Sequence, residues 1–259
     1  MSRTPVLRLA TVALAVAVTA GLGVASAGPA TAVANGEIVP QGKYQFSVKL
    51  TATGIPTADG GRRNSACSGA LVAPQWVVTA GHCFRDLNGV RVERTVADLT
   101  TATVGRADLS GSHGQVVTVV AVRQSPTNDL ALAKLERPVR HIKPIALAHR
   151  PPAVGDLLRL TGYGAVSSVD PVPSTVLRTG LVAVTDVGTD TIGVTGHYPQ
   201  RDTGACLYDS GAPYFVDPPH GKPRLVSIES DGPACPHTDI EITSRVDNIA
   251  DWIHQIIRG

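Results

Sequence analysis

Short apolar runs separated by turn residues dominate the sequence between residues 44 and 246. In the run 44–50, apolar residues alternate with Gln45, Ser47 and Lys49, which is the two-residue period of a β-strand. Similar runs recur at 76–79, 116–122, 129–135, 157–160, 192–194, 225–228 and 240–246. With 19 Pro and 26 Gly among 259 residues, turns come too often for a helical bundle. The pattern is typical of all-β barrels or sandwiches.

Two segments depart from this pattern. Residues 137–152 contain four prolines and no clear period, and we expect them to link two halves of the chain. The last segment, about 246–258, is predicted to form a helix that docks on a core, with Asp247 capping its start. Its apolar stripe recurs at intervals of three and four residues: Ile249, Trp252, Ile253, Ile256 and Ile257.

Residues 1–32 have the order of a secretory signal peptide. Arg3 and Arg8 precede an apolar stretch, and small residues follow it. Cleavage motifs of the A-x-A type end at Ala27 and at Ala32. A membrane anchor is the alternative, but the apolar run is short for a spanning helix and rich in Ala and Gly. We therefore expect a secreted, extracellular protein.

The net charge of the chain gives no reason to expect attraction to charged partners. The sequence has 23 basic and 21 acidic residues, and two of the basic ones, Arg3 and Arg8, belong to the signal segment. The rest of the chain is therefore neutral and has no long basic run, so we expect no nucleic-acid partner. No later stretch approaches the roughly 20 apolar residues of a membrane span, and we expect no membrane contact once the signal is removed.

Four cysteines follow the signal segment: Cys67, Cys83, Cys206 and Cys235. An oxidising compartment makes disulfides plausible, and four cysteines allow three connectivities. The two pairings that close short loops join Cys67 with Cys83 and Cys206 with Cys235. Each would stabilise the fold by about 3 kcal/mol. A zinc site is the alternative, but no ligand spacing supports it, and we expect no metal.

Three local sequences carry chemically reactive side chains: TAGHC around His82, NDLAL around Asp129 and DSGAP around Ser210. Each one alone is readily structural, as a His beside a Cys, an Asp that opens a strand and a polar turn. Together, and in this order, they resemble the trypsin- and chymotrypsin-like serine proteases, whose motifs are T-A-x-H-C, N-D-[IL]-x-L and G-D-S-G-G-P. The intervals of 47 and 81 residues between the three side chains fit that family.

The resemblance covers nearly all of residues 33–259 and includes both cysteine pairs at family spacing. It suggests a secreted, bacterial-type member with a single peptidase domain. The implied fold is all-β, with two packed antiparallel β-barrels and a C-terminal helix. The first barrel would span about 33–140 and the second about 150–245, with the cleft between them.

The resemblance implies a role for each of the three side chains. Ser210 would attack a peptide carbonyl and form an acyl-enzyme, because His82 accepts its proton. Asp129 would fix the His82 tautomer and stabilise the imidazolium. The expected substrate is a polypeptide, a proteinaceous inhibitor would be a further partner, no cofactor is needed, and a monomer is the default.

The residues VANG from Val33 stand where the family has a sequence like I-V-G-G. In relatives a freed α-amino group at this place pairs with the Asp before the nucleophile, which here is Asp209. Cleavage after Ala32 would expose Val33 directly, and we favour it. Cleavage after Ala27 would instead leave a short pro-segment that another protease must remove.

Tyr208 departs from the family, which has Gly at this position. The backbone N–H groups of Tyr208 and Ser210 should form the oxyanion hole, and loss of one such donor costs about 10²–10³ in rate. Gly adopts positive φ readily and Tyr does not. The Tyr208 peptide could therefore be flipped or its ring could crowd the cleft; the alternative is a harmless substitution.

The substrate-binding residues are also unusual. The family's S-W-G wall reads Ser230, Asp231 and Gly232 here. Ser230 should still hold Asp129, and Gly232 should still offer backbone bonds to an extended substrate. At the base of the pocket, Gly204 replaces the Asp of tryptic members.

Glu241 falls where relatives have a Gly that lines the same pocket. A carboxylate there could pair with Lys or Arg at P1, the residue before the scissile bond, and aromatic residues could be tolerated. The alternative is that Glu241 is solvated or pairs with Arg245.

Three other functions compete with the secreted endopeptidase. One is a narrow esterase or a processing protease for one partner. Another is a catalytically silent binding protein on the same fold, which Tyr208 and Asp231 favour and the intact triad disfavours. A metal-binding module that uses the eight His lacks any ligand spacing.

Overall fold

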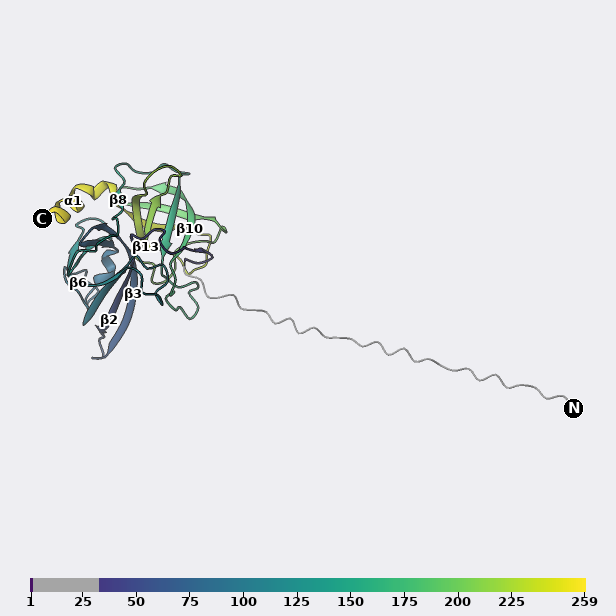
Figure 1. Ribbon diagram of the computed structural model, residues 1–259, viewed down its shortest axis with the longest axis horizontal. Coiled ribbons are helices and arrows are strands. Elements are labelled where there is room, and N and C mark those ends of the chain that lie inside the picture. The colour runs from purple at the N-terminus through teal and green to yellow at the C-terminus, as the bar shows by residue number, and fades with distance from the viewer. Residues whose placement is uncertain (2–32) are drawn as a thin grey trace.

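The computed structural model describes Met1 and residues 33–259, so the expected signal segment lies outside the described residues. Two six-stranded antiparallel β-barrels lie side by side (Figure 1). The first closes in the order β2-β3-β4-β7-β6-β5. Its strands are β2 (Ser47–Pro56), β3 (Arg62–Ala73), β4 (Trp76–Thr79), β5 (Leu99–Val104), β6 (Gln115–Gln124) and β7 (Ala131–Leu135).

The second barrel runs β10-β11-β14-β13-β12-β9 and closes through the pairing of β9 with β10. Its strands are β9 (Leu157–Gly162), β10 (Arg178–Val187), β11 (Thr191–Tyr198), β12 (Pro213–Val216), β13 (Arg224–Asp231) and β14 (Glu241–Arg245). Two short strands join the same sheet, β1 (Glu37–Ile38) beside β10 and β8 (Ala146–Leu147) parallel to β13. The expectation of an all-β protein with two antiparallel barrels and a C-terminal helix is confirmed.

The first described residues belong to the second barrel, not to the first. Val33 is buried in the second core, Ala34 bridges Gly204, and β1 pairs with β10. The expected first barrel of about 33–140 is therefore wrong at its N-terminal end. Val33 and Ala34 are fully buried, so the second barrel removes the apolar surface of this segment from water.

Two polar residues at the start of β2 are buried, although the alternation predicted one apolar face. Ser47 and Lys49 are at most 5% exposed, because the second barrel covers this face. The Ser47 hydroxyl lies 2.8 Å from the Thr161 hydroxyl of β9 and links the barrels. The strand also continues to Pro56, beyond the predicted residue 50.

The C-terminal helix α1 (Ala250–Arg258) follows a 3₁₀ turn, η2 (Asp247–Ile249). Ile253 is fully buried, and the apolar stripe packs on the core that contains the first barrel. Asp247 does not cap the helix, which corrects the expectation. Its carboxylate instead binds the Arg245 guanidinium at 2.8 Å.

Within the described residues, no helix has the length and apolarity that a membrane crossing requires.

Candidate active site

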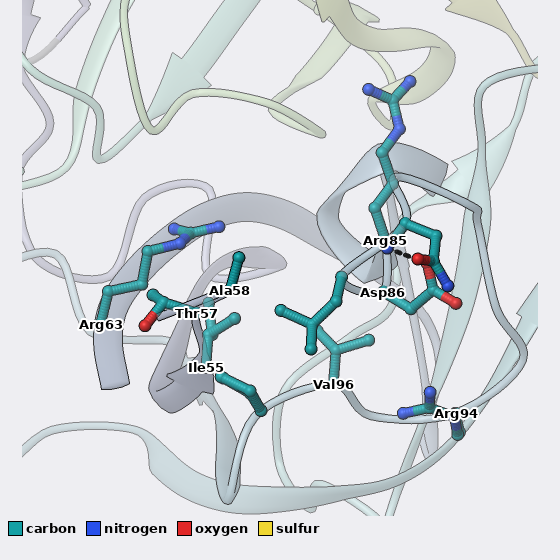
Figure 2. A pocket seen from close by; sticks show the side chains of 11 residues that line it. Ile55, Thr57, Ala58, Arg63, Arg85, Asp86, Arg94 and Val96 are labelled. Carbon is teal, nitrogen blue, oxygen red and sulfur yellow. Dashed lines mark hydrogen bonds between the residues drawn. The ribbon is translucent and has the colours of Figure 1, made fainter. Parts of the chain in front are cut away.

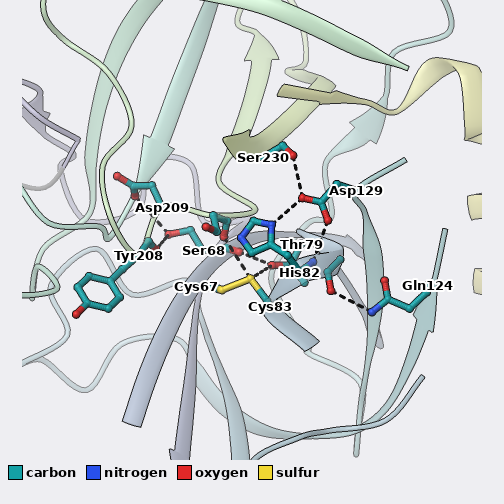
Figure 3. Close-up of a disulfide and its surroundings, with 12 residues drawn as sticks. Cys67, Ser68, Thr79, His82, Cys83, Gln124, Asp129, Tyr208, Asp209 and Ser230 are labelled. Atoms are coloured by element: carbon teal, nitrogen blue, oxygen red, sulfur yellow. Dashed lines mark hydrogen bonds and ion pairs between the residues drawn. A yellow bond between two sulfur atoms is a disulfide. The ribbon is translucent and has the colours of Figure 1, made fainter. Parts of the chain in front are cut away.

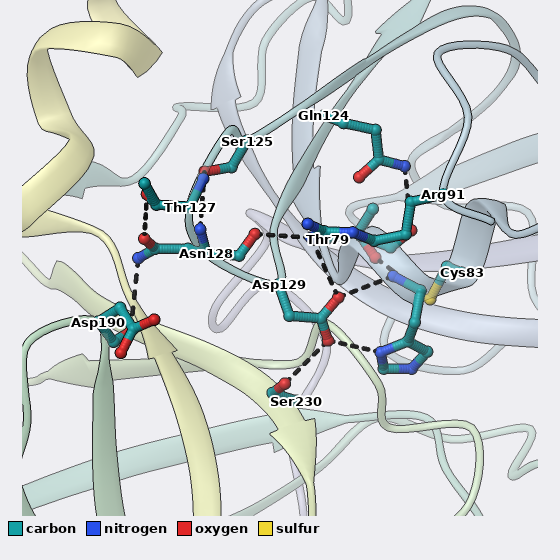
Figure 4. A network of polar contacts seen from close by, with 12 residues as sticks. Thr79, Cys83, Arg91, Gln124, Ser125, Thr127, Asn128, Asp129, Asp190 and Ser230 are labelled. Atoms are coloured by element: carbon teal, nitrogen blue, oxygen red, sulfur yellow. Dashed lines mark hydrogen bonds and ion pairs between the residues drawn. The ribbon is translucent and has the colours of Figure 1, made fainter.

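His82 and Asp129 meet through two hydrogen bonds. His82 lies in the 3₁₀ turn η1 (Gly81–Phe84) after β4, and Asp129 precedes β7, the partner of β4 in the first barrel. The His82 backbone N–H donates to Asp129 Oδ1 at 2.9 Å, and the ring Nδ1 lies 2.7 Å from Oδ2 (Figures 3 and 4). With Asp129 ionised, Nδ1 carries the proton and Nε2 keeps its lone pair.

The Asp129 carboxylate also receives a bond from the second barrel. Ser230 Oγ donates to Asp129 Oδ2 at 2.8 Å, as the sequence predicted. Arg91 Nη1 lies 3.7 Å from Oδ1. Burial raises the pKa of Asp129, but the hydrogen bonds and charge of His82 and the Ser230 hydroxyl outweigh it, and the net pKa lies below its usual range. The carboxylate is therefore ionised at neutral pH.

Asn128 anchors the loop that carries Asp129. Its buried side chain donates to the Arg245 carbonyl at 2.8 Å and to Asn248 Oδ1 at 3.1 Å, so it binds the second barrel and the segment before α1. Thr127 Oγ1 donates to the Asn128 side-chain oxygen at 2.7 Å, and the Asn128 N–H donates to Ser125 Oγ at 3.1 Å. These four bonds fix the direction in which Asp129 projects.

Ser210 lies on the loop before β12, where the first barrel reaches across. The Ser68 N–H of β3 donates to the Ser210 carbonyl at 2.9 Å. Gly211 follows with a φ of 83°, and a Cβ on it would overlap Thr79 and the Ser68 carbonyl, so this position requires glycine. The loop can therefore approach the first barrel closely enough for Ser210 to face His82.

Ser210 and His82 line the same two cavities, of about 420 and 370 Å³. Among the described residues, no hydrogen bond joins the Ser210 hydroxyl to the His82 ring. Such a bond is often long in a free enzyme and tightens when substrate binds. His82 thus lies between Asp129, to which its ring bonds, and the two cavities that it lines together with Ser210.

Tyr208 adopts the conformation that glycine would favour. Its φ is 73°, in the left-handed region, which costs a non-glycine residue about 1–2 kcal/mol. Ser68 Oγ donates to the Tyr208 carbonyl at 3.3 Å. The ring points away from His82 (Figure 3) and lies 6.0 Å from the Lys49 ammonium. Tyr208 therefore does not crowd the His82 side of the cleft.

Asp209 is fully buried and is held by backbone N–H groups. Gly164 N donates to its carboxylate at 2.7 Å and Cys206 N at 3.1 Å. Burial raises the pKa of Asp209 to about 7, although these bonds and the charge of Lys49 act in the opposite direction. Val33 is buried in the second core, and no bond between Val33 and Asp209 is recorded among the described residues.

Both disulfides stand beside this site. Cys67 of β3 pairs with Cys83, the residue after His82, and Cys206 pairs with Cys235. The first ties the histidine turn to β3. The second ties the loop before Asp209 to the segment between β13 and β14.

The cavity of about 370 Å³ extends from Ser210 along β13, with Ser230, Asp231 and Gly232 in its wall. Gly204 precedes Ala205 of this wall, and a Cβ on Gly204 would overlap Glu241 Oε1, so glycine leaves room for this carboxylate. Glu241 is 2% exposed, which rules out the solvated alternative. The alternative partner, Arg245, binds Asp247 instead.

Asp231 engages the neighbouring backbone. Its carboxylate accepts a 3.0 Å bond from the Gly232 N–H, the group expected to bind an extended substrate. A substrate that pairs here must therefore displace the Asp231 carboxylate. A β-bulge between Glu229 and Asp231 re-aims Ser230 toward Asp129.

A further cavity of about 490 Å³ lies beyond His82 along the first barrel (Figure 2). Ile55 and Val96 form its apolar side, and three arginines border it, Arg63, Arg85 and Arg94. It adjoins the 420 Å³ cavity, since both share Ile55, Arg63 and Arg85. The groove on this side of Ser210 is therefore cationic.

Sequence reasoning missed several residues at this site: Lys49, Arg91, Tyr214, Glu229 and His237. One signal was available, because Glu229 follows the apolar run 225–228, where an acid is out of pattern. The others contact the site only through long-range pairing, which no local motif encodes.

Comparison with known proteins gives a consistent result. The family model described as Trypsin matches residues 33–253. A beta-fibrinogenase-like protein of Daboia siamensis is 29% identical over 74% of this chain and 78% of its own length. The human chymotrypsin-like elastase family member 3B is 31% identical over 70% of this chain and 67% of its own. These relatives are animal proteins, so they give no support to the bacterial-type qualifier.

The strain at Tyr208 can be measured by comparing Tyr208→Gly with Tyr208→Ala. Both variants lack the ring, and the difference isolates the backbone conformation. We expect the Gly variant to be more stable by about 1 kcal/mol in urea unfolding, because alanine keeps the left-handed penalty. An Ala variant that is equally or more stable would contradict the strained conformation.

Proposed function

The chain belongs to the trypsin family of serine endopeptidases, and on that premise we propose that it cleaves polypeptides through a triad of Ser210, His82 and Asp129. The observation that carries the proposal is the two-bond contact between His82 and Asp129, with Ser230 on the same carboxylate. A half-buried, ionised carboxylate on Nδ1 leaves Nε2 free to accept a proton from Ser210.

In the proposed reaction the Ser210 oxygen attacks the peptide carbonyl carbon as its proton passes to His82 Nε2. The carbonyl oxygen becomes an oxyanion, which the N–H groups of Tyr208 and Ser210 would bind. The left-handed Tyr208 supports this role, because it has the conformation expected of glycine there. His82 then gives the proton to the leaving amine, an acyl-enzyme remains on Ser210, and water completes the reaction by the same path.

We assign substrate preference to the cavity beside Ser210. Two buried acids support a basic P1 residue, because Glu229 lines this cavity and Glu241 occupies the space that Gly204 leaves beside it. Ser230, Asp231 and Gly232 would bind the extended backbone of the substrate.

The N-terminal segment supports control by processing. Val33 is inserted in the second core, and Ala34 pairs with Gly204 of the pocket. We propose that cleavage after Ala32 frees the Val33 amine, which then pairs with Asp209 and holds the loop that carries Ser210. The signal-like residues 1–32 support secretion. Outside the cell, the proposed protein is a monomer that meets polypeptide substrates and proteinaceous inhibitors.

A fluorophosphonate probe tests the triad, since it reacts with an activated serine. We expect labelling of the secreted protein, no labelling of Ser210→Ala, and a fall of about 10⁴-fold in kcat for Asp129→Asn. Asp251→Asn, an exposed change on α1, is the matched control and should keep full activity. A folded, unmodified protein that is neither labelled nor active would point to the silent binding protein instead.

The N-terminal proposal predicts a dependence on the first residue. Protein that begins at Val33 should exceed protein that begins at Gly28 in kcat/KM by about 10²-fold or more, because an unpaired buried charge costs several kcal/mol. Asp209→Asn should remove this difference. N-terminal sequencing that finds Gly28 on fully active secreted protein would overturn the proposal.

A further inference from the structure

Two buried glutamates lie on neighbouring strands, and one of them lines the cavity beside Ser210. Glu229 on β13 is 5% exposed and lines the cavity together with Ser210 and Ser230. Glu241 is 2% exposed and lies on β14, which pairs with β13. The trypsin-type motifs assign no role to Glu229. A carboxyl group on the wall of a substrate cavity is nevertheless placed to contact what enters it.

One phenol joins the two carboxyls. Tyr214 Oη lies 2.7 Å from Glu229 Oε2 and 2.7 Å from Glu241 Oε2, and all three side chains are buried. The phenol has a single proton and can donate to one carboxylate. The second contact requires a proton from the other carboxyl, since two ionised oxygens at this distance repel each other. The geometry thus calls for one proton shared by the pair.

The two carboxyls have different surroundings. Glu241 Oε1 has no hydrogen bond, points toward Gly204, and lies 3.5 Å from His237 Nε2. Both side chains approach Gly232, where an added Cβ would lie 3.7 Å from Glu229 Oε1 and 3.3 Å from Glu241 Cγ. Of the two glutamates, Glu229 lines the cavity together with Gly232, and Glu241 does not. Glu229 is therefore the one placed to contact a bound substrate, with Glu241 beside it.

We propose that Glu229 is the residue that contacts a cationic P1 side chain, and that Glu241 is a positioning residue which shares one proton with it through Tyr214. This rests on the proposed endopeptidase function and deepens its substrate preference. With the proton on Glu229, this part of the cavity wall is neutral, and the charge of the pair lies on Glu241 beside His237.

A cation that enters the cavity draws the negative charge from Glu241 to Glu229, while the number of protons on the three side chains stays the same. The Glu229 proton passes to Tyr214 Oη while the Tyr214 proton passes to Glu241, so the negative charge moves to Glu229. The pocket then accepts neutral P1 residues in one form and Lys or Arg in the other. When the shared proton leaves at higher pH, both carboxyls are ionised and the preference for a cation increases.

The charged groups around Glu229 and Glu241 set the pH at which the shared proton leaves. Burial raises the pKa of Glu229 well above its usual value, and the charges of Glu241, Asp209 and Asp231 raise it further. His237 faces Glu241, and this contact with the carboxylate raises the pKa of His237, with Asp239 nearby. The positive charge of Lys49, on β2, opposes the rise in the pKa of Asp209. The three neighbouring acids all favour retention of the shared proton, so the preference for basic P1 should rise with pH above the ordinary glutamate range.

The experiment compares two peptides that differ only at P1, one with arginine and one with its neutral isostere citrulline. Both peptides depend on His82 in the same way, so any pH dependence of catalysis by His82 cancels in the ratio of their kcat/KM values. We expect the ratio to rise by about tenfold or more between about pH 5 and pH 9, since each unit of pKa difference corresponds to tenfold in relative affinity. In Glu229→Gln the ratio should fall to about 1 at every pH, while citrulline cleavage is retained.

Glu241→Gln is the matched isosteric control. It should keep the arginine preference but show the rise at lower pH, because removal of a like charge lowers the pKa of Glu229. An unchanged ratio in Glu229→Gln overturns the inference. If Glu241→Gln then loses the preference, Glu241 alone recognises the cation, and the proposed function stands without the shared proton.

The unmodified protein also decides the matter if Glu229→Gln does not fold. A ratio that is independent of pH overturns the shared proton. A ratio near 1 throughout, with citrulline cleaved, overturns both this inference and the basic P1 preference. Absence of any cleavage, with no fluorophosphonate labelling, contradicts the endopeptidase itself and is thereby distinguished from failure of the pocket.

Discussion

The Asp129 carboxylate is the contact on which the site depends, because donors from both barrels converge on it. His82 gives it a ring and a backbone N–H from the first barrel, and Ser230 gives it a hydroxyl from the second. Asn128 binds the neighbouring loop to the Arg245 carbonyl across the same boundary. A carboxylate removed from water needs such donors to remain ionised. The relative position of the barrels and the chemistry of His82 are therefore set by the same bonds.

The rest of the site follows from close approach between the barrels. Gly211 lets the nucleophile loop contact β3, and the strained Tyr208 holds its carbonyl against Ser68. Lys49 and Asp209 are buried where this loop crosses to the first barrel. Strain and buried charge persist only when the surrounding structure fixes them. Here the surrounding structure consists of two rigid barrels and two disulfides.

Local motifs were sufficient to predict the candidate catalytic residues but not the pocket beside them. The TAGHC, NDLAL and DSGAP sequences identified His82, Asp129 and Ser210, and the period of residues 44–50 predicted a strand. β3 was not among the predicted strands, since Arg62 to Ser68 has no apolar alternation and pairs through its backbone. The contact between Glu229 and Glu241 was not predicted, because Tyr214 on β12 reaches both across the neighbouring strands β13 and β14, and no local motif encodes that pairing. The bound of the first barrel at residue 33 was wrong, although the expected pairing of Val33 with Asp209 already pointed to the second barrel.

The central claim is that Asp129 fixes the His82 tautomer that serves Ser210. Nitrogen-15 NMR of the imidazole in the Val33-started protein tests it most directly, at a pH above that at which the ring gains its second proton. The account predicts a proton on Nδ1, shifted downfield by the 2.7 Å bond to Asp129, and an unprotonated Nε2. A ring protonated mainly on Nε2 would contradict it, because Nε2 could then not accept the proton of Ser210.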